Sequence, residues 1–79
     1  MSALYVLEIT RPRSWRDAYH HDPLAHLAEV STALRVEREA GTQLRARCFE
    51  GDRVRDLAVA TYDGRRWIYG ASHAVRRPS

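Results

Sequence analysis

Histidine and cysteine are the side chains of this chain best suited to metal binding or catalysis, and their spacing favours neither. The histidines are His20, His21, His26 and His73. Two ligands on one helix face need a spacing of four residues, whereas His21 and His26 are five apart. Asp22 and His26 have the required spacing, but Asp22 precedes a proline and is better explained as a helix cap. We therefore expect no metal site and no cofactor.

Cys48 is the only cysteine, so the chain has no internal disulfide. A thiol nucleophile needs exposure and a neighbouring base. Cys48 instead alternates with Leu44 and Ala46 in a strand-like segment, where a thiol behaves as a small hydrophobic side chain. Neither a glycine-rich phosphate loop nor a Ser/His/Asp arrangement is present. The sequence predicts a protein that is not an enzyme, and the lone cysteine favours a reducing, cytoplasmic location.

Length and charge bound the domain organisation and the partners. The 79 residues suffice for one domain, residues 1–79, of which residues 76–79 are expected to be a frayed tail. No apolar run approaches the roughly 18 residues of a membrane span. Residues 1–41 carry 5 arginines and 6 acids (net −1), and residues 42–79 carry 8 arginines and 4 acids (net +4). We expect no membrane partner, and the basic second half leaves nucleic-acid binding open.

The first half of the chain predicts one strand and one main helix. Residues 4–10 are rich in aliphatic and β-branched side chains, so we expect a first strand that joins the edge of a sheet. Within residues 11–21, residues 14–17 fit the capping-box pattern of a short helical turn, although no apolar periodicity extends it. We expect Trp15 and Tyr19 of this stretch to cover the core. Asp22 and Pro23 mark the start of a helix that runs to about Ala40.

The apolar pattern of this helix predicts which side packs on the sheet. Gly41 supplies a residue that tolerates the left-handed conformation common at helix ends. Within the helix, apolar side chains recur at spacings of three and four residues, which predicts one buried stripe of Leu24, Leu27, Val30 and Leu34.

The second half predicts three antiparallel strands, residues 42–50, 53–62 and 65 to about 75. They are joined by the two-residue loops Gly51-Asp52 and Asp63-Gly64, both of which are hairpin signals. The predicted fold class is therefore α+β with the order β-α-β-β-β, the main helix covering one face of a three-stranded meander.

Two-residue loops fix the pairing register and hence the face on which each side chain lies. The predicted helix-facing side chains are Leu44, Ala46, Cys48, Leu57, Val59 and Ile68. The opposite face is predicted to interleave aromatic residues with arginines, and its candidate partner-binding residues are Arg45, Arg47, Phe49, Tyr62, Arg65, Trp67 and Tyr69.

Three interpretations of this second face follow. In the leading one it binds a protein, first of all a second copy of the chain in a homodimer, because aromatic residues and arginine are enriched at interfaces and a chain this short gains stability from association. In the second, the aromatic rings stack on nucleic-acid bases while arginines contact phosphates. In the third, Trp67 and Tyr69 form a minor second core beneath residues 11–21.

Overall fold

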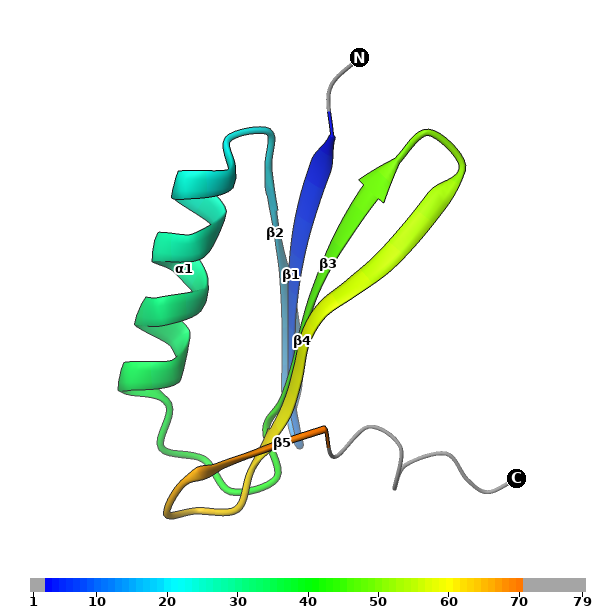
Figure 1. The fold of residues 1–79 in the computed structure, drawn as a ribbon. Coiled ribbons are helices and arrows are strands. Elements are labelled where there is room, and N and C mark those ends of the chain that lie inside the picture. Colours follow the sequence, from blue (N-terminus) through cyan, green and yellow to red (C-terminus); the bar gives the residue numbers. More distant parts are fainter. Residues whose placement is uncertain (1–2, 71–79) are drawn as a thin grey trace, which may run out of the picture.

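A computed structural model describes residues 3–70, which form an α+β fold with one helix packed on a five-stranded antiparallel sheet (Figure 1). The strand order is β2-β1-β3-β4-β5. The elements in chain order are β1 (Leu4–Arg11), β2 (Ser14–His20), α1 (Pro23–Val36), β3 (Gln43–Glu50), β4 (Arg53–Tyr62) and β5 (Trp67–Tyr69). None of the helices within residues 3–70 is long and apolar enough to cross a membrane.

The first hairpin corrects two predictions about the first half of the chain. Residues 14–20 form the strand β2 and not a helical turn, and β2 pairs along its whole length with β1. Because β2 takes the edge of the sheet, β1 lies between β2 and β3. Arg11 pairs with Ser14, so Pro12 and Arg13 form a two-residue hairpin loop. Strand β2 then runs antiparallel to β1, and its backbone groups form hydrogen bonds with those of β1.

Helix α1 begins as predicted. The carboxylate of Asp22 accepts a hydrogen bond from the Leu24 amide at 3.0 Å, and Pro23 occupies the first turn. The helix ends at Val36, four residues before the predicted end. Glu37 adopts an extended backbone conformation, and Gly41, with a φ of +93°, lies in the connection to β3.

Buried hydrogen bonds of Glu37 explain the early end of α1. Its carboxylate accepts hydrogen bonds from the Glu39 amide at 3.0 Å and from the Thr42 hydroxyl at 2.9 Å, and it pairs with Arg11 at 3.0 Å. Burial raises the pKa of Glu37, but these hydrogen bonds outweigh burial and hold the pKa below its usual value. The chain therefore leaves the helix where it can place this carboxylate.

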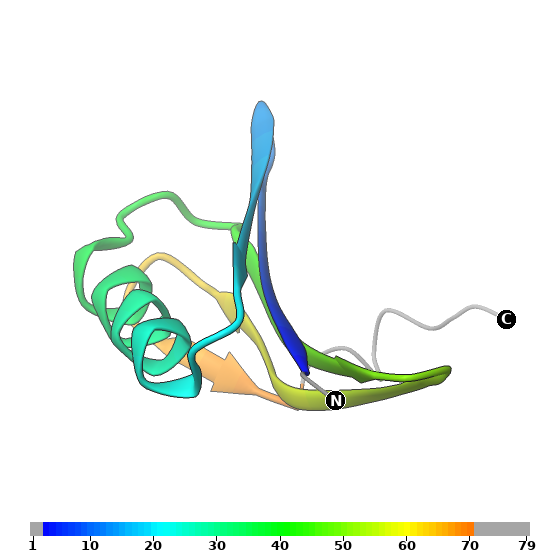
Figure 2. The ribbon, with the colours of Figure 1, turned by 90° about the horizontal axis from the view of Figure 1, so that it is seen from above.

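The helix is rotated relative to the predicted apolar stripe. Its buried residues are His26, Val30 and Ala33, whereas Leu24 and Leu27 are 74% and 60% exposed. The helix packs against β1 and β2, the strands that turn toward it as the sheet bends (Figure 2). The His26 ring fills this interface, with its centroid 5.3 Å from that of Tyr5 and 5.9 Å from that of His20.

The β3–β4 hairpin follows the predicted register for only half its length. Pairing runs as predicted from Glu50 and Arg53, on either side of the Gly51-Asp52 loop, to Arg47 and Asp56. A β-bulge then leaves Leu57 without a partner, because Ala46 pairs with Ala58. A slip of one residue exchanges the two faces of a strand, so the rest of β4 faces opposite to the prediction.

The turn before β5 is longer than predicted. Tyr62 pairs with Trp67, so the loop contains four residues, Asp63 to Arg66. The Asp63 carboxylate accepts hydrogen bonds from the amides of Arg65 and Arg66, each at 2.8 Å, and these bonds hold the pKa of Asp63 below its usual value. This register slip is two residues, so it does not itself change the face of any β5 side chain. The faces of β5 are nevertheless the reverse of the prediction, because β5 pairs with the part of β4 that follows the bulge. The predicted continuation to residue 75 and the predicted tail lie outside the described residues.

The core lies between α1 and the sheet and contains Leu7, Ile9, Val30, Ala33, Leu44 and Ala46. The predicted burial of Leu44, Ala46 and Cys48 is confirmed. The predicted burial of Leu57, Val59 and Ile68 is wrong, because the bulge turns Val59 away from the helix and leaves Leu57 and Ile68 exposed. Ala60 and Tyr62 are buried on the helix side in their place.

Candidate interaction surface

The face of the sheet turned away from α1 is not covered by any other element within residues 3–70 (Figure 2). We call it the open face. Strand alternation and the pairing registers define its side chains. They are Leu4, Val6, Glu8 and Thr10 of β1, Trp15, Asp17 and Tyr19 of β2, Gln43, Arg45, Arg47 and Phe49 of β3, Val54, Asp56, Val59 and Thr61 of β4, and Ile68 of β5.

The structure distributes the seven predicted site residues over three places. Arg45, Arg47 and Phe49 lie together on the open face. Tyr62, Trp67 and Tyr69 lie on the helix side of the sheet, and Arg65 belongs to the turn before β5. The prediction that all seven share one face is therefore wrong. The bulge at Leu57 moves Tyr62, Trp67 and Tyr69 to the helix side, and the four-residue turn takes Arg65 out of the strand.

Trp67 has a defined structural partner on the helix side. Its indole nitrogen donates a hydrogen bond to the Leu34 carbonyl oxygen at 2.9 Å, and its ring lies 5.3 Å from the ring of the buried Tyr62. Leu34 is in the last turns of α1, so Trp67 joins β5 to the helix. A large aromatic residue on a short edge strand here has a packing role.

Trp15 and Tyr19 are open-face aromatic residues that the sequence interpretation assigned to a cover over the core. Both lie on β2, and they are 66% and 61% exposed. The alternation of Trp15, Asp17 and Tyr19 is the signal that would have placed them on one face of a strand. The open face thus keeps an aromatic and arginine-bearing character with a different set of aromatic residues.

Polar contacts hold several open-face side chains in position. The Tyr19 hydroxyl donates a hydrogen bond to the Asp17 carboxylate at 3.1 Å, and this bond raises the pKa of Tyr19. The Arg47 guanidinium lies 3.8 Å from the Glu8 carboxylate and 5.5 Å from the centre of the Phe49 ring. Val6 is only 3% exposed although no layer formed by residues 3–70 covers this face, so its neighbouring side chains bury it.

The charges of the open face nearly balance. Its acids are Glu8, Asp17 and Asp56, and its bases are Arg45 and Arg47, which gives a net charge of −1. The other arginines of the described residues lie elsewhere, as in the turn before β5, which carries Arg65 and Arg66. A phosphate-binding sheet would concentrate positive charge on the binding face, and this face does not.

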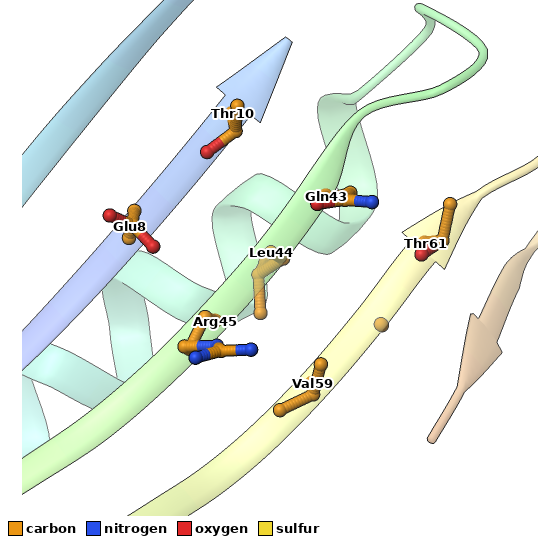
Figure 3. Close-up of a pocket in the computed structure, with 8 residues that line it drawn as sticks. Glu8, Thr10, Gln43, Leu44, Arg45, Val59 and Thr61 are labelled. Carbon is orange, nitrogen blue, oxygen red and sulfur yellow. The ribbon is translucent and has the colours of Figure 1, made fainter. Parts of the chain in front are cut away.

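A shallow hollow of about 80 Å³ lies on the open face over β1, β3 and β4. Figure 3 shows the side chains at its rim, with α1 behind the sheet, and the Arg45 side chain extending toward β4. The rim is formed by Glu8, Thr10, Gln43, Arg45, Val59 and Thr61. Ordinary ligand pockets have volumes of roughly 300 Å³ or more. The hollow is too small for such a ligand and suits an inserted side chain.

The histidines do not form a metal centre in the part of the chain that the structure describes. No group of three or more histidine, cysteine, aspartate or glutamate side chains within residues 3–70 is arranged to hold a metal ion. His26 is 5% exposed, and burial, followed by the neighbouring His20, lowers its pKa. Cys48 is buried with a free thiol, and His73 lies outside the described residues.

Comparison of the chain with protein-family models, curated proteins and solved structures found no match in any of the three. The geometry and chemistry of the two faces of the sheet are therefore the basis of the functional argument.

Proposed function

We propose that this chain is a non-enzymatic interaction or regulatory module whose open face binds another protein surface. The observation that carries the proposal is the exposure of Trp15 and Tyr19, 66% and 61%, on a sheet face that no other element within residues 3–70 covers. Large aromatic side chains that stay exposed among polar groups on one face of a small protein are typical of interaction sites.

The composition of the open face supports a protein partner. Tryptophan, tyrosine and arginine are the residue types most enriched among binding hot spots, and Trp15, Tyr19 and Arg47 are all present there. Two of these side chains are also held in position before binding, because Tyr19 is hydrogen-bonded to Asp17 and Arg47 lies over the ring of Phe49. Such ordering lowers the entropy that association costs. The partner is a second copy of the chain or a different protein.

Nucleic acid is the alternative partner, and the observation that favours it is the grouping of Arg45 and Arg47 with Phe49 on β3. Aromatic residues beside arginines are the components of single-strand binding sheets. The net charge of −1 on this face favours a protein over a polyphosphate, since phosphate contacts supply most of nucleic-acid affinity.

A matched pair of tyrosines tests the proposal. Tyr19 and Tyr69 have nearly equal exposure, 61% and 60%, but lie on opposite faces of the sheet. Affinity capture from the native host, quantified by mass spectrometry, would compare the wild-type chain with Tyr19→Ser and Tyr69→Ser variants. We expect Tyr19→Ser to reduce specific capture by about tenfold or more, as truncation of a hot-spot residue does, and Tyr69→Ser to leave it unchanged. Equal capture by all three chains would contradict the proposal.

The nucleic-acid alternative has its own charge-matched test. Fluorescence anisotropy with a labelled single-stranded oligonucleotide would compare an Arg45→Glu, Arg47→Glu double variant with an Arg53→Glu, Arg55→Glu double variant. Arg53 and Arg55 lie on β4 and face the other side of the sheet. Binding that weakens steeply with salt and is lost only in the first variant would establish the alternative and displace the protein-binding proposal.

A further inference from the structure

No element within residues 3–70 covers an apolar groove on the helix side of the sheet. It lies between α1 and β4 and has a volume of about 280 Å³. Leu27 of the helix and Leu57 at the bulge form opposite walls, and Ala46 and Ala58 are among the residues between them. The bulge that moves Val59 to the open face also sets Leu57 against this groove. Leu57 is exposed within residues 3–70, although it is a large apolar side chain.

A ridge of helix side chains runs beside the groove. At 100° per residue, Leu24, Leu27 and Ser31 fall on one flank of α1. Leu24 and Leu27 are the two most exposed leucines of the described residues, at 74% and 60%. These are the residues that the sequence pattern assigned to the core, and the rotation of α1 toward β1 and β2 leaves them without an apolar partner there.

The ridge of Leu24, Leu27 and Ser31 carries no charge where it borders the groove. Arg35 is exposed and continues the same flank one turn beyond Ser31, but it does not line the groove. From Pro23 to Leu34 the only acidic or basic side chains are His26, which is buried, and Glu29. Glu29 is turned to the opposite flank, where it pairs with Arg16 and lies 3.9 Å from His20. A two-fold dimer places each surface against its own copy, so charge on that surface would repel itself. An uncharged ridge beside an apolar groove avoids this repulsion.

We propose that a second copy of this chain docks on the groove, with Leu24 and Leu27 of each copy entering the groove of the other about a two-fold axis. A ridge that lies next to a groove is self-complementary under such an axis, because each copy supplies both halves. Leu27 of one copy then meets Leu57 of its partner copy. The small side chain of Ser31 permits close approach of the two helices.

This dimer goes beyond the function proposed above and does not depend on it. The groove lies on the helix side, so both open faces stay accessible in the dimer. A partner with two binding sites would then be held by both copies, which raises the effective affinity without any new contact.

Sedimentation equilibrium of the full chain, from low micromolar to about 500 µM, measures the association directly. We expect a monomer–dimer equilibrium in the wild-type chain. Leu27→Glu should raise the dimer dissociation constant by about tenfold or more, because it places two like charges in an apolar interface. Thr32→Glu, the same charge on another flank of the same helix, should leave the constant unchanged, and circular dichroism of each variant checks that the fold is retained.

A mixture of two variants with opposite charges at the proposed contact distinguishes the loss of docking from a folding defect. Leu27→Glu and Leu57→Arg chains should each be largely monomeric, and a mixture of the two should form heterodimers, since each pair then joins opposite charges at one of its two contacts. A wild-type chain that stays monomeric would overturn the inference, as would failure of the mixture to associate. A dimer that is abolished by Tyr19→Ser and unaffected by Leu27→Glu would also overturn it and would assign self-association to the open face.

Discussion

The two faces of the sheet differ in how their apolar side chains are used. On the helix side, Leu44 and Ala60 are almost completely buried and Trp67 is bonded to the helix backbone. On the open face, Trp15 and Tyr19 remain mostly exposed and no residue within 3–70 packs over them. The buried side chains of the helix side stabilise the fold, whereas the two large aromatic side chains of β2 on the open face contribute little to the core. In a chain this small the helix side must supply most of the folding free energy.

Truncation of an apolar side chain should destabilise the fold much more on the helix side of the sheet than on the open face. Leu44 on β3 and Val59 on the neighbouring strand β4 allow this comparison. Leu44→Ala should lower the free energy of unfolding by about 3 kcal/mol, because Leu44 is buried beneath α1. Val59→Ala, which removes methyl groups from the half-buried open face, should cost about 1 kcal/mol or less. Urea denaturation of both variants measures the difference. Equal destabilisation would contradict the assignment of Val59 to the open face.

A second effect concerns Glu37, the buried anchor at the end of the helix. Its hydrogen bonds lower its pKa in the folded state below the unfolded value, so its contribution is present above the unfolded pKa and is lost as the pH falls toward the folded pKa. Glu37→Gln should lower the free energy of unfolding by about 2 kcal/mol at neutral pH. The variant should also lose less stability than the wild-type chain as the pH is lowered. Glu50→Gln, at the exposed end of β3, is the control. It should change neither the free energy of unfolding at neutral pH nor the way in which stability depends on pH. Parallel pH profiles for wild type and Glu37→Gln would refute this role.

A smaller effect is expected from His26 at the helix–sheet interface. Burial lowers its folded pKa below the ordinary value of about 6.5. The unfolded chain therefore binds more protons, and stability should be full above about pH 6.5 and fall as the pH decreases toward the folded pKa. Thermal denaturation between pH 7.5 and 5 should show this loss in wild type and in His21→Gln, whose histidine is exposed, and a weaker loss in His26→Phe. An unchanged profile in His26→Phe would exclude the histidine as the cause.

Much of the fold could be predicted because its signals are local. The Asp22-Pro23 start of α1 and the Gly51-Asp52 hairpin follow from side-chain hydrogen bonding and backbone preference over a few residues. The end of α1 could not be predicted in this way, because it depends on the meeting of Glu37 with Arg11, which is 26 residues away. The strand β2 was missed because the capping-box pattern at residues 14–17 was given more weight than the alternation of Trp15, Asp17 and Tyr19, which marks one face of a strand.

The candidate site could be predicted only in part, and the two register errors show why. The extended loop after Tyr62 moves the register by two residues and changes no face, whereas the single unpaired Leu57 exchanges the faces of β4 beyond it. Arg45, Arg47 and Phe49 lie on β3, whose own alternation is not interrupted by the bulge in β4. They therefore remain on the open face, as predicted. Nothing in the sequence next to Leu57 marks an extra residue, since a bulge is fixed by how both strands pack.

The two tryptophans differ in place: Trp15 lies on the open face, and Trp67 belongs to the helix side. Acrylamide quenching of tryptophan fluorescence tests this difference with two single-tryptophan chains, Trp67→Phe and Trp15→Phe, at low protein concentration and with the fold of each checked by circular dichroism. We expect the chain that retains Trp15 to be quenched more steeply than the chain that retains Trp67, because Trp15 is 66% exposed and the Trp67 indole is bonded to Leu34. Equal quenching, or steeper quenching of Trp67, would contradict the account.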